Sequence, residues 1–379
     1  MFERPESGDR ALVVALDIGR DGRADRTVEI AALAESAGAT VVGNLRGRRP
    51  RPDPAWFAGR GKVDEIAARC READADLVIF DHALSGVQQR NLEQALECRV
   101  VDRTSLILDI FAQRAQSAEG KLQVELAQLS HMATRLAGGW THLERQKGGI
   151  GLRGPGETQL ETDRRLITQR VKLLRERLRR VARSRATQNR ARHRADVRTV
   201  ALVGYTNAGK STLFNRLTAA NVYTANQLFA TLDTKLRRLR IPAAASIVVS
   251  DTVGFIRDLP HDLVAAFRAT LAEAADADLL LHVIDASADN RDEQIEAVDA
   301  LLAEIGAGDV PQIRVFNKID IAHTGPGVER DPCGNISSVR VSATAGAGIA
   351  ELRDALAERF PASPTPFSEP IDAPARSGY

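Results

Sequence analysis

The stretch that decides the fold is Gly204-Tyr205-Thr206-Asn207-Ala208-Gly209-Lys210-Ser211-Thr212, which follows the apolar run of residues 200–203. It fits the phosphate-loop pattern G-x-x-x-x-G-K-[ST]. The glycines at its two ends let the backbone curl with its N–H groups pointing inward, so the loop can hold a triphosphate at the start of the following helix. Lys210 would supply charge to the β- and γ-phosphates, and Ser211 a hydroxyl to Mg2+. The sequence therefore predicts an α/β domain that binds a nucleoside triphosphate.

The apolar run of residues 246–250 reads as a buried strand and ends in Asp251-Thr252-Val253-Gly254. In this D-x-x-G pattern, Asp251 can hold Mg2+ through water, and the Gly254 N–H can approach the γ-phosphate. On its own the pattern is also typical of an ordinary turn between a strand and a helix. Its place after the phosphate loop favours the magnesium and phosphate interpretation.

Two later motifs indicate which base is bound. Residues 313–316 read as a strand that ends in Asn317-Lys318-Ile319-Asp320, and a further strand leads into Ser342-Ala343. The Asp320 carboxylate can accept from the N1–H and N2–H2 edge of guanine, a donor pair that adenine lacks. Lys318 can lay its aliphatic stem on the base, Asn317 can tie the base loop to the phosphate loop, and Ser342-Ala343 suits backbone contacts to guanine O6. Because these motifs follow predicted strands, where open α/β sheets bind ligands, they predict a GTP site.

A switch loop is expected at Phe229-Ala230-Thr231-Leu232-Asp233, in a polar stretch too irregular for a helix. The Thr231 hydroxyl and backbone could complete the Mg2+ shell only when a γ-phosphate is present. The loop would then order with GTP and relax after hydrolysis. The alternative is a threonine on an ordinary surface loop.

The segment immediately before the phosphate loop is strongly basic, although the whole chain has a formal net charge of only +2. Between residues 164 and 198 the only acidic residues are Glu176 and Asp196, against Arg164, Arg165, Arg170, Lys172, Arg175, Arg177, Arg179, Arg180, Arg183, Arg185, Arg190, Arg192, Arg194 and Arg198. A solvated helix face is one interpretation. The excess is too one-sided for charges that pair with each other, so a polyanion partner is favoured.

Apolar residues in this region recur at three- and four-residue steps after the first, a spacing typical of a helix-helix seam: Leu160, Ile167, Val171, Leu174, Leu178 and Val181. An upstream segment has a similar spacing: Leu122, Leu126, Leu129, Met132 and Leu136. The two predict an antiparallel helical hairpin. Its connector, residues 138–156, is too long for a simple turn and carries Trp140, His142, Arg145, Lys147 and Arg153 among glycines. It reads either as a tip that probes RNA or as a disordered loop.

Short apolar runs at residues 11–16, 40–43, 76–80 and 99–101 alternate with helical stretches such as 63–71. This alternation predicts a small parallel α/β domain. The nearby Gly59-Arg60-Gly61-Lys62 lacks the full phosphate-loop spacing, so a tight turn before a helix is favoured over phosphate binding. The expected parts are an α/β domain (1–112), a basic helical hairpin (113–197), a Ras-like doubly wound GTPase domain (198–361) and a flexible tail (362–379).

Composition excludes several classes of protein. The three cysteines are far apart in the sequence and make no metal-binding spacing, so a reduced setting is expected. There is no apolar run of membrane-spanning length and no signal-peptide core at the amino terminus, so we expect a soluble, cytoplasmic protein, and a monomer. The aromatic content of 4% argues against a base-stacking platform as the route to RNA.

Gln227 to Asp233, beside GYTNAGKST and DTVGFI, resembles the HflX family of translational GTPases. Residues 59–63, 88–93 and 101–104 resemble the amino-terminal domain of that family. Residues 148–165, which read GGIGLRGPGETQLETDRR, match its most distinctive block. One departure is visible: many members have a proline after Asp233, where this chain has Thr234, which leaves the shape of the switch exit open.

The resemblance implies nucleotide contacts at Gly204 to Ser211, Phe229 to Asp233, Asp251 to Gly254, Asn317 to Asp320, and Ser342 to Ala343. Ser211 and Thr231 would ligate Mg2+, and Lys210, Thr231 and Gly254 would be the catalytic residues. It also implies that the helical region and its loop contact the large ribosomal subunit and its rRNA, in ribosome splitting, rescue or assembly. The residue after D-x-x-G is Phe255, where Ras-like enzymes have a water-orienting glutamine, so slow intrinsic hydrolysis that awaits a partner is expected.

Two rival functions stay open. One is a GTP-gated adaptor of a protein partner at a membrane, with the basic helix on lipid headgroups. The other is an RNA-modifying or RNA-folding GTPase, which is less favoured because there is no catalytic cysteine motif at the C-terminus and little chain after Ser342 for a further RNA-binding domain.

Overall fold

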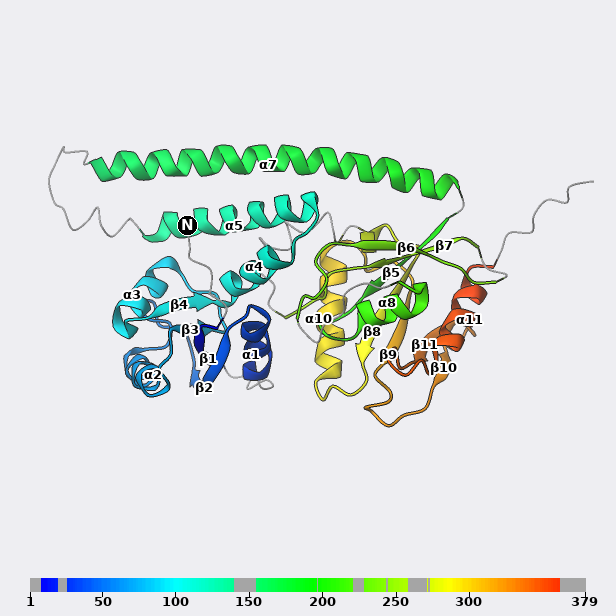
Figure 1. Cartoon of the computed structure of the whole chain (residues 1–379), viewed down its shortest axis with the longest axis horizontal. Coiled ribbons are helices and arrows are strands. Elements are labelled where there is room, and N and C mark those ends of the chain that lie inside the picture. The colour runs from blue at the N-terminus through cyan, green and yellow to red at the C-terminus, as the bar shows by residue number, and fades with distance from the viewer. Residues whose placement is uncertain are drawn as a thin grey trace, which may run out of the picture.

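A computed structural model describes residues 8–19, 26–139, 155–195, 197–220, 228–242, 245–257, 271 and 273–361. An amino-terminal α/β unit and a larger α/β unit lie side by side, and a long helix passes above both (Figure 1). The predicted fold class is confirmed. The predicted tail, most of the connector (including Trp140, His142, Arg145, Lys147 and Arg153) and Gln227 lie outside the described residues.

The amino-terminal unit is a parallel four-stranded sheet in the order β2-β1-β3-β4. Each predicted apolar run falls within a strand or reaches into one. The chain order is β1 (Arg10–Ile18), α1 (Arg26–Ser36), β2 (Thr40–Arg49), α2 (Arg60–Ala73), β3 (Leu77–Phe80), α3 (Gly86–Leu96), β4 (Arg99–Asp102) and α4 (Arg103–Arg114). Gly59 is the residue before α2 and has a φ of 79°, so the structure has the expected turn at this position.

The next two helices pack together as the predicted hairpin arms. They are α5 (Ala118–Gly139) and α7 (Pro155–Arg194), and α7 is 40 residues long. Between residues 161 and 184, the positions of α7 that are not exposed are Ile167, Val171, Leu174, Leu178 and Val181, as the spacing predicts. The side chains of Leu136 and Leu160 are outside the description.

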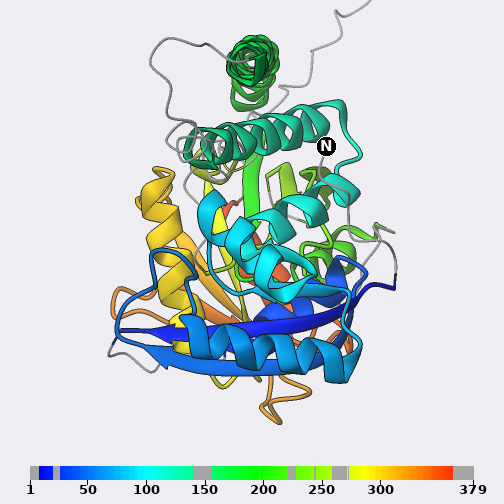
Figure 2. The same ribbon diagram turned by 90° about the vertical axis from the view of Figure 1, so that its left-hand side faces the viewer.

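Helix α5 is buried on more than the predicted seam. Gln123, Val124 and Ala127 are buried, because α5 also packs on α3 and α4 of the amino-terminal unit. In Figure 2, α5 lies between α7 and the rest of the molecule. The hairpin therefore rests on the amino-terminal unit and does not stand free of it.

The larger unit is a seven-stranded sheet in the order β10-β11-β9-β8-β5-β7-β6. Its chain order is β5 (Arg198–Val203), α8 (Lys210–Thr218), β6 (Lys235–Leu239), β7 (Ile247–Asp251), β8 (Leu279–Asp285), α10 (Arg291–Glu304), β9 (Gln312–Asn317), β10 (Gly327–Arg330), β11 (Ile336–Arg340) and α11 (Ile349–Arg359). The central strands are parallel, and the edge strands β6 and β10 are antiparallel to their neighbours. The predicted motifs follow β5, β7, β9 and β11, at the C-terminal ends of the parallel strands.

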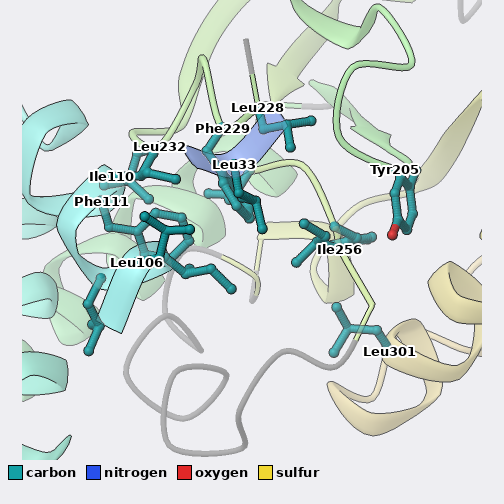
Figure 3. Packing of buried hydrophobic residues seen from close by; sticks show 14 of the residues in the cluster. Leu33, Leu106, Ile110, Phe111, Tyr205, Leu228, Phe229, Leu232, Ile256 and Leu301 are labelled. Atoms are coloured by element: carbon teal, nitrogen blue, oxygen red, sulfur yellow. The ribbon is translucent and has the colours of Figure 1, made fainter. Parts of the chain in front are cut away.

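The two units share a hydrophobic core. Leu33 of α1 and Leu106, Ile110 and Phe111 of α4 belong to one buried cluster with residues 228, 229, 232 and 256 of the larger unit (Figure 3). The rings of Phe111 and Phe229 meet edge to face, with their centroids 4.7 Å apart. Such pairs add about 0.5–1.5 kcal/mol beyond the burial of their area. The predicted switch loop is thus built into the interface between the two units.

Cys70 and Cys98 are far apart in the sequence but adjacent in the fold, where a hydrogen bond between their side chains lowers the pKa of Cys70. Both are free thiols in the structure. None of the helices in the described part of the chain combines the length and apolar character that a membrane span needs.

Candidate nucleotide-binding site

The phosphate loop joins β5 to α8, and its glycines are required by close approaches. Gly204 has a φ of 146°, and a Cβ there would overlap the Val283 carbonyl. Gly209 has a φ of 93° and precedes the first residue of α8, and a Cβ there would overlap the Asn317 side chain. Positive φ at both positions lets the loop curl before the helix.

Lys210 is buried and folds back onto the loop. Its Nζ donates to the carbonyl oxygens of Gly204 at 3.0 Å and Tyr205 at 2.7 Å. Burial lowers the pKa of its ammonium to about 8, although the Asp251 carboxylate opposes this shift. A desolvated cation with only carbonyl partners is suited to an anionic ligand, because phosphate oxygens would restore the charge compensation that water no longer provides.

Hydroxyl and carboxylate oxygens converge beside the first turn of α8. The Ser211 Oγ lies 2.7 Å from Asp251 Oδ2 and 2.8 Å from Thr231 Oγ1, and Thr231 Oγ1 is 3.1 Å from the same carboxylate oxygen. The other oxygen, Asp251 Oδ1, is buried without a hydrogen-bond partner among the described residues. Such a set of hard oxygen donors, one of them unsatisfied, fits Mg2+.

The D-x-x-G segment is tied to the phosphate loop. Phe255 N–H donates to the Gly204 carbonyl at 3.1 Å, and Thr206 N–H donates to the Phe255 carbonyl at 2.7 Å. Gly254 lies against Thr206, where a Cβ would come 2.8 Å from the threonine Cγ2. The Phe255 side chain points into the core shared by the two units and is 2% exposed. It is therefore a packing residue of the interface between the two units.

The predicted base-reading residues lie around Asn317. Its Nδ2 donates to the Ala208 carbonyl at 2.9 Å, and its Oδ1 accepts from the Ala343 N–H at 2.9 Å. The phosphate loop and the two base loops are therefore joined by one amide. The Ala343 N–H is engaged in this bond, so a contact from Ser342-Ala343 to guanine O6 stays a prediction.

Lys318 has a partner that sequence reasoning missed. Its Nζ forms an ion pair with Asp285 Oδ2 at 2.7 Å, and Asp285 ends β8, the strand beside β9. The sequence does contain a signal for Asp285: it is a carboxylate at the end of an apolar run, the same pattern that identified Asp251. Asp320 is exposed in the loop that follows β9.

The amino-terminal unit supplies a second missed feature, a cluster of charged side chains under the phosphate loop. Arg103 is 4% exposed and pairs with Glu29 and Asp81. Glu29 also accepts from the Tyr205 hydroxyl, and Arg103 donates to the Arg257 carbonyl at 3.0 Å. Burial raises the pKa of Asp81 to about 6, although Arg103 opposes this. No sequence motif predicts this cluster, because its members are far apart in the sequence.

The switch loop is held from outside the larger unit. Leu228 N–H donates to the Ser36 hydroxyl at 3.0 Å, and Phe229 and Leu232 are 2% and 3% exposed. Asp233 contacts the start of α5. A cavity of about 60 Å³ lies between this loop and the phosphate loop, lined by Lys210, Ser211 and Thr231 among others. A larger one, about 670 Å³, lies far from them, between β9, β11 and α11.

Family models match successive parts of the chain. A model described as GTP-binding GTPase N-terminal matches residues 24–112, and one described as GTP-binding GTPase Middle Region matches residues 114–192. A third, described as 50S ribosome-binding GTPase, matches residues 199–318. The third match contains the phosphate loop, the D-x-x-G segment and Asn317.

Curated relatives match over nearly the whole length. GTPase HflX of Escherichia coli (strain K12) is 55% identical over 361 residues, which are 95% of this chain and 85% of the relative. GTPase HflX of Caldanaerobacter subterraneus subsp. tengcongensis is 46% identical over 356 residues, 94% of this chain and 82% of the relative. A solved GTP-binding protein of Sulfolobus solfataricus with GDP is 24% identical with a TM-score of 0.46, over 91% of this chain and 97% of that one.

Proposed function

This chain belongs to the HflX family of GTPases and hydrolyses GTP, and we propose that it uses the nucleotide to control its binding to the large ribosomal subunit. The proposed setting is the cytoplasm, and the proposed task is ribosome splitting, rescue or assembly. The description of the family model over residues 199–318, a 50S ribosome-binding GTPase, supports this proposal.

The nucleotide is proposed to bind across the C-terminal ends of β5, β7, β9 and β11. Lys210 would exchange its carbonyl partners for the β- and γ-phosphates, and the N–H groups of the loop would cradle the same oxygens. The Gly254 N–H would hold the γ-phosphate, and Asp320 would read the guanine edge. Hydrolysis would then rest on positioning and on charge stabilisation, which dominate phosphoryl transfer.

Ser211 and Thr231 would hold Mg2+ directly, with Asp251 acting through water. The ion would neutralise charge on the β- and γ-phosphate oxygens. Thr231 stands in the switch loop, so its hydroxyl links the presence of the γ-phosphate to the order of that loop.

The exposed basic face of α7 is the observation that carries the ribosome proposal. At 3.6 residues per turn, the face turned away from α5 presents Arg165, Lys172, Arg179, Arg180, Arg183, Arg190 and Arg194, all of them exposed. The face is about 44 Å long by helix geometry. Glu176 is the acidic residue in its midst. A long, straight row of cations fits the phosphates of folded RNA.

The test compares GTP hydrolysis by the full chain alone, with purified large subunits, and with vesicles of anionic lipid. We expect large subunits to stimulate turnover at least tenfold over the slow intrinsic rate, because a partner would supply the group that Phe255 cannot. Stimulation by vesicles and not by subunits would favour the membrane adaptor and contradict the proposal.

A further inference from the structure

The carboxylate of Asp233 reaches out of the GTPase unit to the start of α5. Its Oδ2 accepts from the backbone N–H groups of Gln116 and Ser117, both at 2.8 Å, and its Oδ1 accepts from the Ser117 hydroxyl. Ser117 in turn accepts from the Gly120 N–H at 2.8 Å. Gln116 and Ser117 directly precede Ala118, the first residue of α5, and the Ser117 hydroxyl is the group that caps the Gly120 N–H. The switch-loop carboxylate therefore holds the residue that caps α5.

Gly120 gives independent evidence that the first turn of α5 is shaped to accept the Asp233 carboxylate. Glycine inside a helix is unfavourable by about 1 kcal/mol relative to alanine. Here a Cβ at position 120 would overlap Asp233 Oδ1 and lie 3.1 Å from the Ser117 hydroxyl oxygen. The first turn of α5 therefore lacks a side chain at the one place where the carboxylate enters.

Asp233 is two residues from Thr231, whose hydroxyl lies beside Ser211 and Asp251. An extended chain spans at most about 3.6 Å per residue, so Thr231 cannot leave the site far without pulling on Asp233. On the other side of Thr231, the loop is fixed by Phe229 packed on Phe111. Thr231 therefore lies between two residues, Phe229 and Asp233, whose contacts are with residues outside the GTPase unit.

The start of α5 is also joined to α7. Glu119, next to the capped residues, pairs with Arg185 of α7 at 2.9 Å. Arg185 pairs further with Glu273 of the GTPase unit at 3.5 Å. A shift of the α5 start would therefore change the ion pair between Glu119 and Arg185 and so act on α7.

We propose that Asp233 is a positioning residue that acts through Thr231: its bonds to the α5 start hold the threonine in place and carry the nucleotide state of the loop to the hairpin. The inference rests on the proposed role of Thr231 in the presence of a γ-phosphate. When the loop orders, Asp233 holds Ser117 in its capping position. When the loop relaxes, this support of the cap is withdrawn.

The test follows amide hydrogen exchange of residues 114–124 in the full chain, loaded with Mg2+ and either GDP or the non-hydrolysable analogue GppNHp. We expect slower exchange with GppNHp, and loss of this difference in Asp233→Ala and in Gly120→Ala. The two substitutions act oppositely on the stability of α5 itself: Asp233→Ala removes support from its cap, whereas Gly120→Ala raises its helix propensity. If the exchange difference reflected only the stability of α5, the two variants would therefore change it in opposite directions.

Nucleotide affinity gives the second readout. Asp233→Ala should lower the preference for GppNHp over GDP about fivefold, as expected when a helix cap loses its support. Asp233→Asn keeps an accepting oxygen and should restore most of the preference. Asp331→Ala is the matched control, because Asp331 also accepts from two backbone N–H groups, those of Cys333 and Asn335, far from the switch loop.

Retention of the exchange difference in Asp233→Ala or Gly120→Ala, or its absence in the unchanged chain, would overturn the inference. Thr231→Ala separates this failure from a failure of the proposed site. If Thr231→Ala keeps the GppNHp preference, the proposed role of Thr231 is wrong. If Thr231→Ala loses it and Asp233→Ala does not, only the link to α5 is wrong.

Discussion

At the scale of single residues, Asp320 is the residue that we propose reads the base. It is exposed at the end of the loop after β9, so replacing it leaves the core untouched. Asp320→Asn exchanges an acceptor-only carboxylate for an amide and loses charge-assisted hydrogen bonds to guanine. We expect GTP affinity to fall roughly 10- to 100-fold and xanthosine triphosphate to be preferred, measured by titration with labelled nucleotides.

The control for this experiment is Asp331→Ala, which removes an exposed carboxylate from another loop of the same unit. Unchanged GTP affinity in Asp320→Asn would show that the guanine assignment is mistaken.

His282 of β8 is buried on the face of the sheet covered by α10. Burial lowers its pKa to about 4, and Arg314 adds to the effect while Gln312 opposes it. The Asp299 carboxylate lies 3.6 Å from Nδ1, which is beyond hydrogen-bond range. The folded pKa lies below the unfolded value of about 6.5, so the unfolded chain takes up the proton first as pH falls.

Stability should therefore drop between pH 6.5 and pH 4 on account of His282. Between pH 7 and pH 5 the loss is about 2 kcal/mol. Asp81 has a raised pKa and acts in the opposite direction, so the measurement is a difference: urea unfolding of the unchanged chain against His282→Gln at both pH values. Equal pH dependence in the two proteins would contradict the prediction.

Local motifs predict the residues of the GTPase unit that the structure brings together, and they do so for a physical reason. Asp251 and Asn317 end strands, and Lys210 and Ser211 open the helix that follows β5 and the phosphate loop, so their positions depend on short-range chain geometry. The partners of Tyr205 and Lys318 depend instead on which strands and units pack side by side. Nothing local in the sequence specifies that Glu29 meets Tyr205.

At the scale of elements, α7 is the helix that we propose binds RNA. Replacing Lys172, Arg179 and Arg183 by Glu cancels the net positive charge of its outer face without touching the seam with α5. We expect affinity for rRNA to fall, and its dependence on salt to weaken by about 2–3 in the log-log slope, since each lost phosphate contact removes roughly 0.7–0.9. Basal GTP hydrolysis should stay unchanged.

The matched control for α7 carries the same change of charge elsewhere. Arg69, Arg71 and Arg90 are exposed on the amino-terminal unit, and their replacement by Glu should leave RNA binding nearly unaltered. Filter binding at several salt concentrations measures both variants. Equal losses of RNA affinity in the two variants would mean that binding depends only on the net charge of the protein and that α7 does not contact RNA specifically.

Periodicity predicts the seam of α7 because one face meets one partner. For α5 the same argument identifies only half of the buried surface, since Gln123 and Ala127 pack on the amino-terminal unit. The edge strands β6 and β10 were not predicted, because they are short and largely polar and their pairing is set by the neighbouring strands.

At the scale of the whole molecule, the two α/β units act as one body through a shared core and the Arg103 cluster. Arg103→Met would remove the cation that the buried Asp81 and the half-buried Glu29 share, and would leave them with the more distant Arg26 and Arg257. Breaking a buried pair from one side costs about 3–5 kcal/mol. We expect a loss of that size in urea unfolding, with partial recovery when Glu29→Gln and Asp81→Asn are added. A loss below about 1 kcal/mol would show that water reaches the cluster.

The central claim is that GTP controls attachment to the large ribosomal subunit. The most direct measurement is co-sedimentation of the full chain with purified large subunits, with GppNHp or with GDP, at equal Mg2+. The account predicts that the chain pellets with the subunits in GppNHp and stays in the supernatant in GDP, and that Glu at Lys172, Arg179 and Arg183 abolishes pelleting. Equal pelleting with the two nucleotides, or none with either, would contradict it.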